Sequence, residues 1–284
     1  MKKISTFLIV VFVLTIAVSC KSKVLVADIA PQYFTDSIYS TSLSEYRKHN
    51  VYLPLNFNKR KKYPIIYTTD GSAISSDGLI KKALDSLIGN KIIKPVVLIE
   101  SFSKHKIADS SGTFGDGKKV YLQYRNFEYI NNYQNVAPNP LLENRFKNHM
   151  TYFKDELISS VEGKLTEKIK RKDRYFYGYS NGAGFGLSLL NTHPDLIGTY
   201  LCFSTFGGDV QTNNWNKDVH YPTLYLKFGK NEPTFLKEDA DFLKAKYDDL
   251  NAFIDIEEFD GGHDWKKWNK GFIETVLKLF AEKK

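Results

Sequence analysis

Cysteine, methionine and tryptophan are scarce in this chain of 284 residues, which contains two, two and three of them respectively. The cysteines are Cys20 and Cys202, so a framework of several disulfides is excluded. Cys202 lies in an apolar run that favours a buried, inert thiol. The six histidines are scattered, and no two have the spacing of metal ligands on one helix or strand. The sequence therefore predicts no metal site.

Long apolar runs are also lacking, except near the N-terminus. Lys2 and Lys3 precede an apolar segment over residues 4–18, shorter than the roughly 20 residues of a membrane span but suited to a secretory signal peptide. It ends in Ala17-Val18-Ser19-Cys20, which resembles a bacterial lipobox. We expect cleavage before Cys20, lipid attached to Cys20, and an exported protein anchored in the bacterial cell envelope. An ordinary signal peptide or an anchor helix, with Cys20 incidental, is the alternative.

Positive charge exceeds negative charge, with a formal net charge of +8 at pH 7. The one dense cluster, Lys59-Arg60-Lys61-Lys62, lies between two strand-like segments and is typical of a solvated turn. In an exported protein, a basic balance favours anionic surfaces or acidic substrates. The sequence contains no recognisable DNA- or RNA-binding motif, so we expect no nucleic-acid partner.

Short apolar runs rich in β-branched and aromatic residues predict strands over residues 50–54, 63–68, 95–100, 174–179, 198–204, 221–228 and 252–259. Helical patterns fall between many of them, over residues 77–88, 142–165, 182–192, 236–250 and 265–280. This alternation predicts an α/β fold with a mostly parallel, doubly wound sheet flanked by helices. We expect a signal peptide over residues 1–19, a tether over residues 20–35 and a single domain over residues 36–284.

Residues 101–142 break this alternation. The segment is long, rich in Gly, Asn and Tyr, and lacks a clear period. Loops of that length in a compact domain are usually functional or disordered, and the aromatic content argues against disorder. We expect packed irregular structure that lines the mouth of a site.

The pentapeptide Gly178-Tyr179-Ser180-Asn181-Gly182 follows a predicted strand and opens a predicted helix. A serine at the tip of such a turn is typical of the nucleophile elbow of α/β-hydrolases. The glycines permit a tight turn that a Cβ atom would obstruct. Ser180 is therefore the candidate nucleophile.

A serine nucleophile needs a histidine base and an acid that orients it, in the chain order serine, acid, histidine. His263 follows two glycines, just after the last predicted strand, and is the candidate base. Glu232 lies on the loop after the preceding strand and is the candidate acid. Asp239, further along in a helical pattern, is the alternative acid.

An acyl-transfer site also needs N–H donors for the oxyanion. The amide of Asn181, at the start of the helix after Ser180, is one candidate. The second is expected from the loop after the strand at residues 63–68, where Ser72 is preferred and Gly71 is the alternative.

Several further motifs follow one another in an order typical of one family: Val51-Tyr52-Leu53-Pro54, Tyr63-Pro64-Ile65-Ile66-Tyr67 with Asp70-Gly71, Arg125-Asn126-Phe127-Glu128-Tyr129, the pentapeptide around Ser180, and Gly261-Gly262-His263-Asp264-Trp265 with Trp268. Over roughly residues 38–280 the chain resembles the esterase family of α/β-hydrolases that includes S-formylglutathione hydrolase, feruloyl and acetyl-xylan esterases, and enterochelin-type siderophore esterases. Its closing motif is most similar to the siderophore branch. That branch usually has a serine- and tryptophan-rich turn where this chain has Thr205-Phe206-Gly207-Gly208-Asp209.

The resemblance implies that Ser180 is the nucleophile, that His263 is the base and that Arg125 faces the substrate. Arg125 could instead pair with Glu128 or Asp70 as a structural strut. Trp265, at the start of the last helix, could wall the site or anchor the helix to the sheet.

The sequence thus predicts a serine esterase that needs no cofactor and acts on a small-molecule or oligosaccharide ester, of the siderophore or acylated-carbohydrate type. The alternatives are a serine peptidase on the same fold and a non-catalytic binding lipoprotein.

Overall fold

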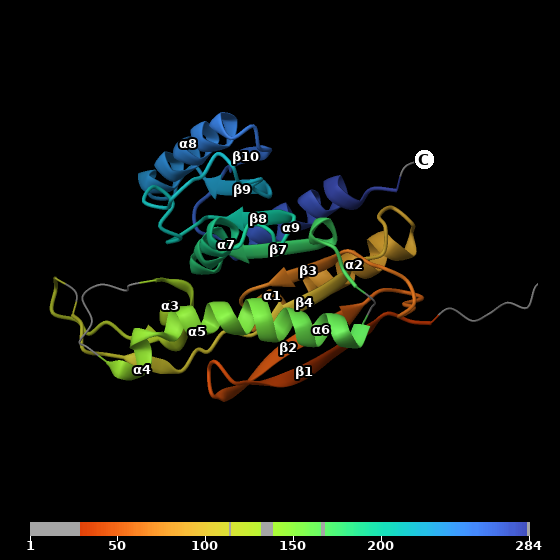
Figure 1. Ribbon diagram of the computed structural model, residues 1–284, viewed down its shortest axis with the longest axis horizontal. Coiled ribbons are helices and arrows are strands. Elements are labelled where there is room, and N and C mark those ends of the chain that lie inside the picture. The colour runs from red at the N-terminus through yellow and green to blue at the C-terminus, as the bar shows by residue number, and fades with distance from the viewer. Residues whose placement is uncertain (1–28, 114, 132–138, 166–167, 283–284) are drawn as a thin grey trace, which may run out of the picture.

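An eight-stranded sheet forms the centre of the molecule, in the order β1-β2-β4-β3-β7-β8-β9-β10 (Figure 1). Its strands are β1 (Gln32–Ser40), β2 (Glu45–Leu53), β3 (Ile65–Thr68), β4 (Val97–Ser101), β7 (Arg174–Tyr179), β8 (Thr199–Phe203), β9 (Thr223–Gly229) and β10 (Ile254–Phe259). β1 and β2 are antiparallel to their neighbours, and the strands from β4 to β10 run parallel. The computed structural model describes residues 29–113, 115–131, 139–165 and 168–282. The predicted signal peptide and Cys20 lie outside them.

Helices cover both faces of this sheet and create two hydrophobic cores. They are α1 (Gly71–Ile74), α2 (Leu79–Gly89), α3 (Tyr124–Tyr129), α4 (Pro140–Glu143), α5 (Arg145–Thr151), the π-helix η1 (Tyr152–Leu157), α6 (Ile158–Leu165), the 3-10 helix η2 (Arg171–Asp173), α7 (Asn181–Thr192), α8 (Thr234–Asp249) and α9 (Trp265–Phe280). One core contains side chains of η1, α6, α7 and α8, and the other contains side chains of α2 and α9. Because side chains alternate along a strand, Ile65 and Tyr67 enter the first core and Ile66 the second. The predicted α/β fold is confirmed.

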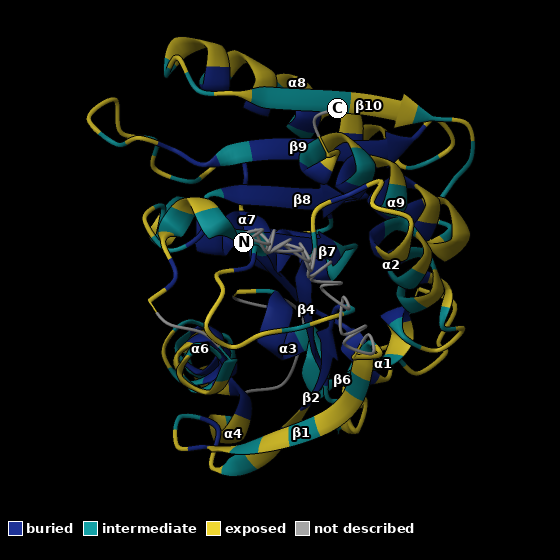
Figure 2. Ribbon diagram, turned by 90° about the vertical axis from the view of Figure 1, so that its right-hand side faces the viewer, coloured by how far each residue is buried: buried dark blue, intermediate teal, exposed yellow. Residues whose placement is uncertain are grey.

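The edge strand β1 was not anticipated from the sequence. It begins at Gln32, so part of the segment predicted as a tether belongs to the domain. Its residues are mostly exposed, whereas β8 is buried along its whole length (Figure 2). An edge strand with polar residues at most positions lacks the continuous apolar run that indicates a buried strand in a sequence.

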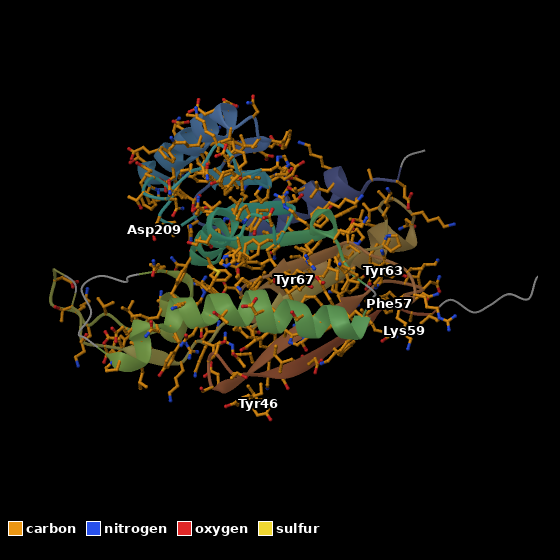
Figure 3. The ribbon with its side chains drawn as sticks, in the orientation of Figure 1. Tyr46, Phe57, Lys59, Tyr63, Tyr67 and Asp209 are labelled. Carbon is orange, nitrogen blue, oxygen red and sulfur yellow. The ribbon has the colours of Figure 1, made fainter. Side chains whose placement is uncertain are left out.

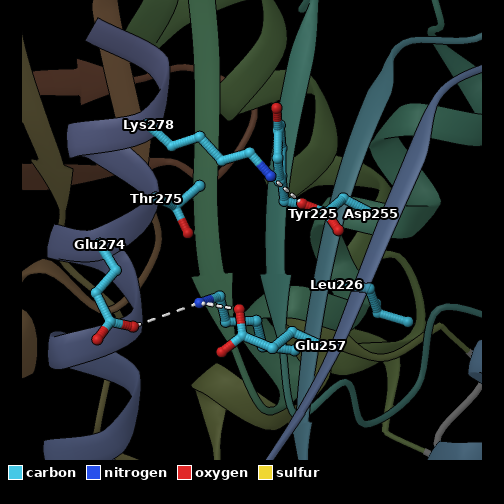
Figure 4. A pocket seen from close by; sticks show the side chains of 8 residues that line it. Tyr225, Leu226, Asp255, Glu257, Glu274, Thr275 and Lys278 are labelled. Atoms are coloured by element: carbon cyan, nitrogen blue, oxygen red, sulfur yellow. Dashed lines mark hydrogen bonds and ion pairs between the residues drawn. The ribbon is translucent and has the colours of Figure 1, made fainter. Parts of the chain in front are cut away.

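α9 is attached to the far end of the sheet by ion pairs as well as by its apolar face. Lys227 of β9 is largely buried and lies 2.7 Å from Glu257 of β10 and 3.6 Å from Glu274 of α9 (Figure 4). Lys278 of α9 contacts Asp255 of β10 at 2.6 Å. None of the described helices is long and apolar enough to cross a lipid bilayer.

The segment between β4 and α5, predicted to be irregular and packed, contains the short strands β5 (Ile107–Asp109) and β6 (Leu122–Gln123) and the helices α3 and α4. A buried charge cluster ties it to the sheet. Glu128 of α3 has no exposed side-chain surface and accepts hydrogen bonds from Arg47 of β2 at 2.7 and 3.0 Å. Arg145 of α5 donates to the same carboxylate at 3.1 and 2.5 Å.

The charges of this cluster outweigh the cost of burying Glu128. Burial alone would raise the pKa of Glu128, but Arg47 and the neighbouring cations lower this pKa to about 2. Since the pKa in the unfolded chain is about 4.3, the ionised carboxylate stabilises the fold above that pH. This contribution is lost as the pH falls from about 4.3 through about 2.

We expect Glu128→Gln to lower the free energy of unfolding at neutral pH by about 3 kcal/mol, because two arginines lose their buried counter-charge. The difference from the unmodified protein should shrink as the pH falls toward about 2, where Glu128 itself takes up a proton. Urea denaturation at neutral and acid pH measures both effects. Glu143→Gln, at an exposed carboxylate of α4, is the matched control. Equal stability of the two variants at neutral pH would contradict this account.

Candidate active site

Ser180 lies at a tight turn between β7 and α7, with a φ of 55° and a ψ of −132°. The positive φ is unusual for a residue with a side chain. A Cβ atom on Gly178 would lie 2.7 Å from the carbonyl oxygen of Gly182, and one on Gly182 would lie 2.3 Å from Thr69 Oγ1. The two glycines of the pentapeptide are thus required by close approach of the backbone. They let the turn project the serine from the carboxyl end of β7.

The end of β8 holds the backbone of Ser180 on both sides. The N–H of Ser180 donates to the carbonyl of Phe203 at 2.9 Å, and the N–H of Phe206 donates to the carbonyl of Ser180 at 3.1 Å. These bonds offset the cost of the strained turn, which is of the order of 1–3 kcal/mol.

The structure brings Ser180, His263 and Glu232 together from the carboxyl ends of three parallel strands. His263 Nε2 lies 3.0 Å from Ser180 Oγ, and His263 Nδ1 lies 2.5 Å from Glu232 Oε1. The His263 side chain is 38% exposed and that of Glu232 only 1%. The histidine therefore lies at the solvent boundary, on a buried carboxylate.

The second oxygen of Glu232 is also occupied. Glu232 Oε2 accepts hydrogen bonds from the N–H of Gly229 at 2.6 Å and from Ser204 Oγ at 2.7 Å. Burial alone would raise the pKa of Glu232, but the bonds from His263, Gly229 and Ser204 outweigh it and hold the pKa below its usual range. Glu232 is consequently ionised at neutral pH.

Ser204 connects Glu232 to the tryptophan of the last helix. Ser204 is fully buried, and its Oγ accepts a hydrogen bond from Trp268 Nε1 at 2.7 Å. The Trp268 ring stacks on Tyr179 with centroids 4.5 Å apart, and meets the His263 ring edge to face at 4.5 Å. One tryptophan thus contacts the base directly and the acid through Ser204.

The sequence analysis did not identify Ser204. β8 and β9 are neighbours in the sheet, so the residues that follow them lie close together. Ser204 follows β8 directly, and its N–H donates to the carbonyl of Lys227 in β9 at 2.7 Å. Its φ of 48°, which turns the side chain toward Glu232, has no sequence signal in a serine.

Asp239, the alternative acid, is not brought to His263. It lies in α8, and its carboxylate accepts a hydrogen bond from Gln211 at 2.8 Å. Burial raises the pKa of Asp239, whereas at Glu232 the hydrogen bonds outweigh burial and lower the pKa.

The candidate oxyanion donors lie at the starts of two helices. Asn181 is the first residue of α7, and Gly71 and Ser72 are the first two residues of α1. The leading N–H groups of a helix have no acceptor within it and point outward from its positive end. The loop before α1 contacts the turn around Ser180, since the missing Cβ of Gly182 would lie 3.1 Å from Asp70 Oδ2.

Arg125 joins these two helix starts. Its Nε and Nη2 each donate to Asp70 at 2.6 Å, and its Nη1 donates to Asn181 Oδ1 at 3.1 Å. The pairing with Asp70 is one of the two strut arrangements considered from the sequence. The Arg125 side chain keeps 15% of its surface exposed, so an edge of it remains open to a ligand.

The two tryptophans of the closing motif have separate environments. Trp268 is buried in the core below α9 and anchors the helix to the sheet. Trp265 is 45% exposed at the first position of α9, so it does not anchor the helix. Aromatic side chains continue around the base: Phe206 lies edge to face with His263 at 4.8 Å, and Phe235, which is 38% exposed, packs on Phe206 at 5.1 Å.

Comparison with known proteins places these features in a family. The family model described as "Putative esterase" matches residues 40–279. The chain is 20% identical over 252 residues to the uncharacterized protein YjcH of Bacillus subtilis (strain 168), covering 85% of this chain and 94% of that protein. A ferulic acid esterase superposes with a TM-score of 0.65 at 17% identity, covering 89% of this chain and 99% of its own. The enterobactin esterase of Shigella flexneri superposes with a TM-score of 0.63 at 16% identity, covering 87% of this chain and 58% of its own.

The solved structures share the fold at low identity, whereas the family model covers most of the chain, from the last residue of β1 to the last turn of α9. This chain is therefore a member of the esterase family that the model describes, and it has the α/β-hydrolase fold of that family.

Proposed function

We propose that this protein is an exported, lipid-anchored serine esterase that cleaves carboxylic esters through an acyl-enzyme. The hydrogen-bond distances from Ser180 through His263 to Glu232 are the main support. Glu232 holds the proton of His263 on Nδ1, which leaves Nε2 to accept the proton of the Ser180 hydroxyl. Signal-peptide cleavage and the lipid on Cys20 are part of the proposal and rest on the sequence of residues 1–20 alone.

The reaction proceeds in two steps. Ser180 Oγ attacks the carbonyl carbon of the ester while its proton moves to His263 Nε2, and the leaving alcohol departs with that proton. A water molecule then gives a proton to His263 and attacks the acyl carbon. The bond to Ser180 Oγ breaks as His263 returns that proton to Oγ, so the acyl group leaves as a carboxylic acid and Ser180 is restored. These steps use no cofactor.

The N–H groups of Asn181 and Ser72, with Gly71 as the alternative to Ser72, stabilise the negative oxygen that forms in both steps. Arg125 positions these donors, because it bonds both Asp70, which precedes α1, and the side chain of Asn181. The exposed edge of Arg125 also remains available to an anionic group of the substrate.

Ser204 and Trp268 position the acid. The Ser204 hydroxyl has one acceptor, Glu232, and one donor, Trp268, so its proton is directed at the carboxylate. With Oε2 held by Ser204 and Gly229, Oε1 stays directed at His263. This restraint keeps the base oriented without contact with the substrate.

The substrate is an ester of a small molecule or an oligosaccharide. Phe206, Phe235 and Trp265 offer aromatic surface near His263, which favours an aromatic acyl or alcohol group. The names of the structural neighbours, a ferulic acid esterase and an enterobactin esterase, agree with such groups. Turnover of catechol siderophores compared with that of feruloylated and acetylated xylo-oligosaccharides decides between the two types.

We expect the segment 21–284, which contains all described helices and strands and both cores, to hydrolyse p-nitrophenyl acetate and butyrate. Ser180→Ala should lower kcat by at least about a thousandfold, because the nucleophile is lost. Its thermal unfolding should be unchanged or slightly raised, since the strained turn remains. Turnover at the original rate in this variant would show that Ser180 is not the nucleophile.

We expect Glu232→Gln to lower kcat by about a hundredfold or more, since an amide can hold His263 in the wrong tautomer. Asp239→Asn is the matched control and should keep activity within about twofold, because Asp239 bonds only Gln211. Steady-state kinetics of both variants measure the difference. A larger loss of kcat in the Asp239 variant would show that Asp239, and not Glu232, is the acid.

We expect Ser204→Gly to lower kcat by about tenfold with little change in KM, because Glu232 loses a charge-assisted hydrogen bond. Glycine accepts the φ of 48° without strain, so part of the stability lost with the hydroxyl is regained. Ser204→Ala keeps the backbone strain of a positive φ, so it should be less stable than Ser204→Gly. The two variants should have similar kcat. Full kcat in Ser204→Gly would show that the hydroxyl has a purely structural role.

A further inference from the structure

The end of the sheet opposite to Ser180 carries many exposed cations. The loops that precede β3, β4 and β7 lie next to one another, because these strands are neighbours in the sheet. Their exposed cations form what we call the basic face, which consists of Lys59, Arg60, Lys61, Lys62, Lys91, Lys94, Lys168, Lys170 and Lys172. Figure 3 labels Lys59 at this end of the molecule, beside Phe57 and Tyr63.

The basic face has few counter-charges. The exposed Glu282 lies beside it, since the N–H of Glu282 donates to the carbonyl of Ile92 at 3.0 Å. Among the described residues of these three loops, the only carboxylate is Asp173, at the start of β7. No ion pair joins a cation of the basic face to another described residue, whereas Lys81, Lys237 and Lys278 elsewhere on the surface each contact an aspartate within 2.8 Å. The next loops along the sheet carry Asp195 and Asp218, so the excess of positive charge is confined to this face.

The basic face is too far from Ser180 to act on a substrate there. β7 spans six residues between Arg174 and the turn at Ser180, a length of about 20 Å. Charges exposed to solvent are largely screened beyond about 10 Å at moderate salt. The unpaired cations therefore favour a separate anionic partner on their own side of the molecule.

The chain enters the domain at the same end. Ile29 and Asn56 are joined by a bond from the Asn56 N–H to the Ile29 carbonyl at 2.9 Å and by one from the Ile29 N–H to Asn56 Oδ1 at 2.8 Å. Asn56 lies in the loop that carries Lys59. The nine peptide links from Cys20 to Ile29 span at most about 30 Å when fully extended. A lipid on Cys20 would keep the bilayer within that distance of Ile29.

We propose that the basic face binds an anionic phospholipid surface, which, resting on the proposed function, is that of the membrane reached by the lipid on Cys20, so that Ser180 faces away from the bilayer. Phosphate headgroups supply counter-charges for the basic face, and each Lys or Arg near such a surface adds about fivefold to the affinity. Ile29 and Ile92, which are 54% and 46% exposed at this end, add apolar contact.

The binding is independent of hydrolysis and can be measured without the lipid. The segment 21–284 should co-sediment with vesicles of phosphatidylcholine containing about one-third phosphatidylglycerol, and not with phosphatidylcholine alone. Binding should be lost at high salt, because it rests on exposed charges. The triple variant Lys59→Glu, Lys61→Glu, Lys62→Glu should bind at least about tenfold more weakly. So should Lys91→Glu, Lys94→Glu, Lys172→Glu, which changes the other two loops.

The matched control is Lys106→Glu, Lys119→Glu, Lys147→Glu, which makes the same change of charge at exposed lysines outside the basic face. It should weaken binding by less than about threefold. Equal losses in all three variants would show that only net charge matters and would overturn the proposal. Equal binding to neutral and anionic vesicles, or tighter binding to duplex DNA than to vesicles of equal phosphate content, would overturn it too. Unchanged ester hydrolysis by the Lys59 triple variant confirms that the fold and the site are intact.

Discussion

Two backbone hydrogen bonds join the peptide of Ser180 to the end of β8, and the other parts of the site depend on them. Phe203 and Phe206, which make these bonds, flank Ser204, and Ser204 in turn holds Glu232. The ring of Phe206 contacts His263. One turn of four residues therefore contacts the proposed nucleophile, base and acid, which come from three other loops. A shift of this turn would disturb all three at once, so its burial is a functional requirement as much as a structural one.

Buried ion pairs hold the segment between β4 and α5 in place, whereas apolar packing holds the sheet together. That segment has only a small apolar cluster of its own, formed by Leu122, Phe127 and Leu142. Glu128 compensates by joining Arg47 of the sheet to Arg145 of α5, and Arg125, three residues earlier, joins Asp70 to Asn181. The same short helix α3 thus anchors the segment and orders the proposed oxyanion donors.

The fold and the three residues Ser180, Glu232 and His263 could be predicted from the sequence because each has a local signal. Buried parallel strands are continuous apolar runs, the turn at Ser180 carries paired glycines, and the loops after two such strands fix where Glu232 and His263 lie. β1 was missed because an exposed edge strand has no such run. The bond from Trp268 to Ser204 joins residues 64 positions apart and depends on a positive φ, which the residue type does not indicate. Trp265 and Trp268 look alike in sequence, and only the exact start of α9 separates the exposed one from the buried one.

A parallel sheet gives the molecule two different ends. The loops that follow the parallel strands meet at one end, and the loops that precede them meet at the other. The carboxyl ends of the strands gather Ser180, Glu232 and His263, where strained turns and helix starts provide positioned side chains and N–H groups. The loops at the amino ends also contain residues with positive φ, Asn56 and Lys91, but none of the three residues Ser180, Glu232 and His263 lies there. Exposed lysines can therefore accumulate at that end without disturbing the site. The chain also enters at that end, next to Asn56. The proposed lipid anchor would restrain this end and leave the proposed site open to esters arriving from solution.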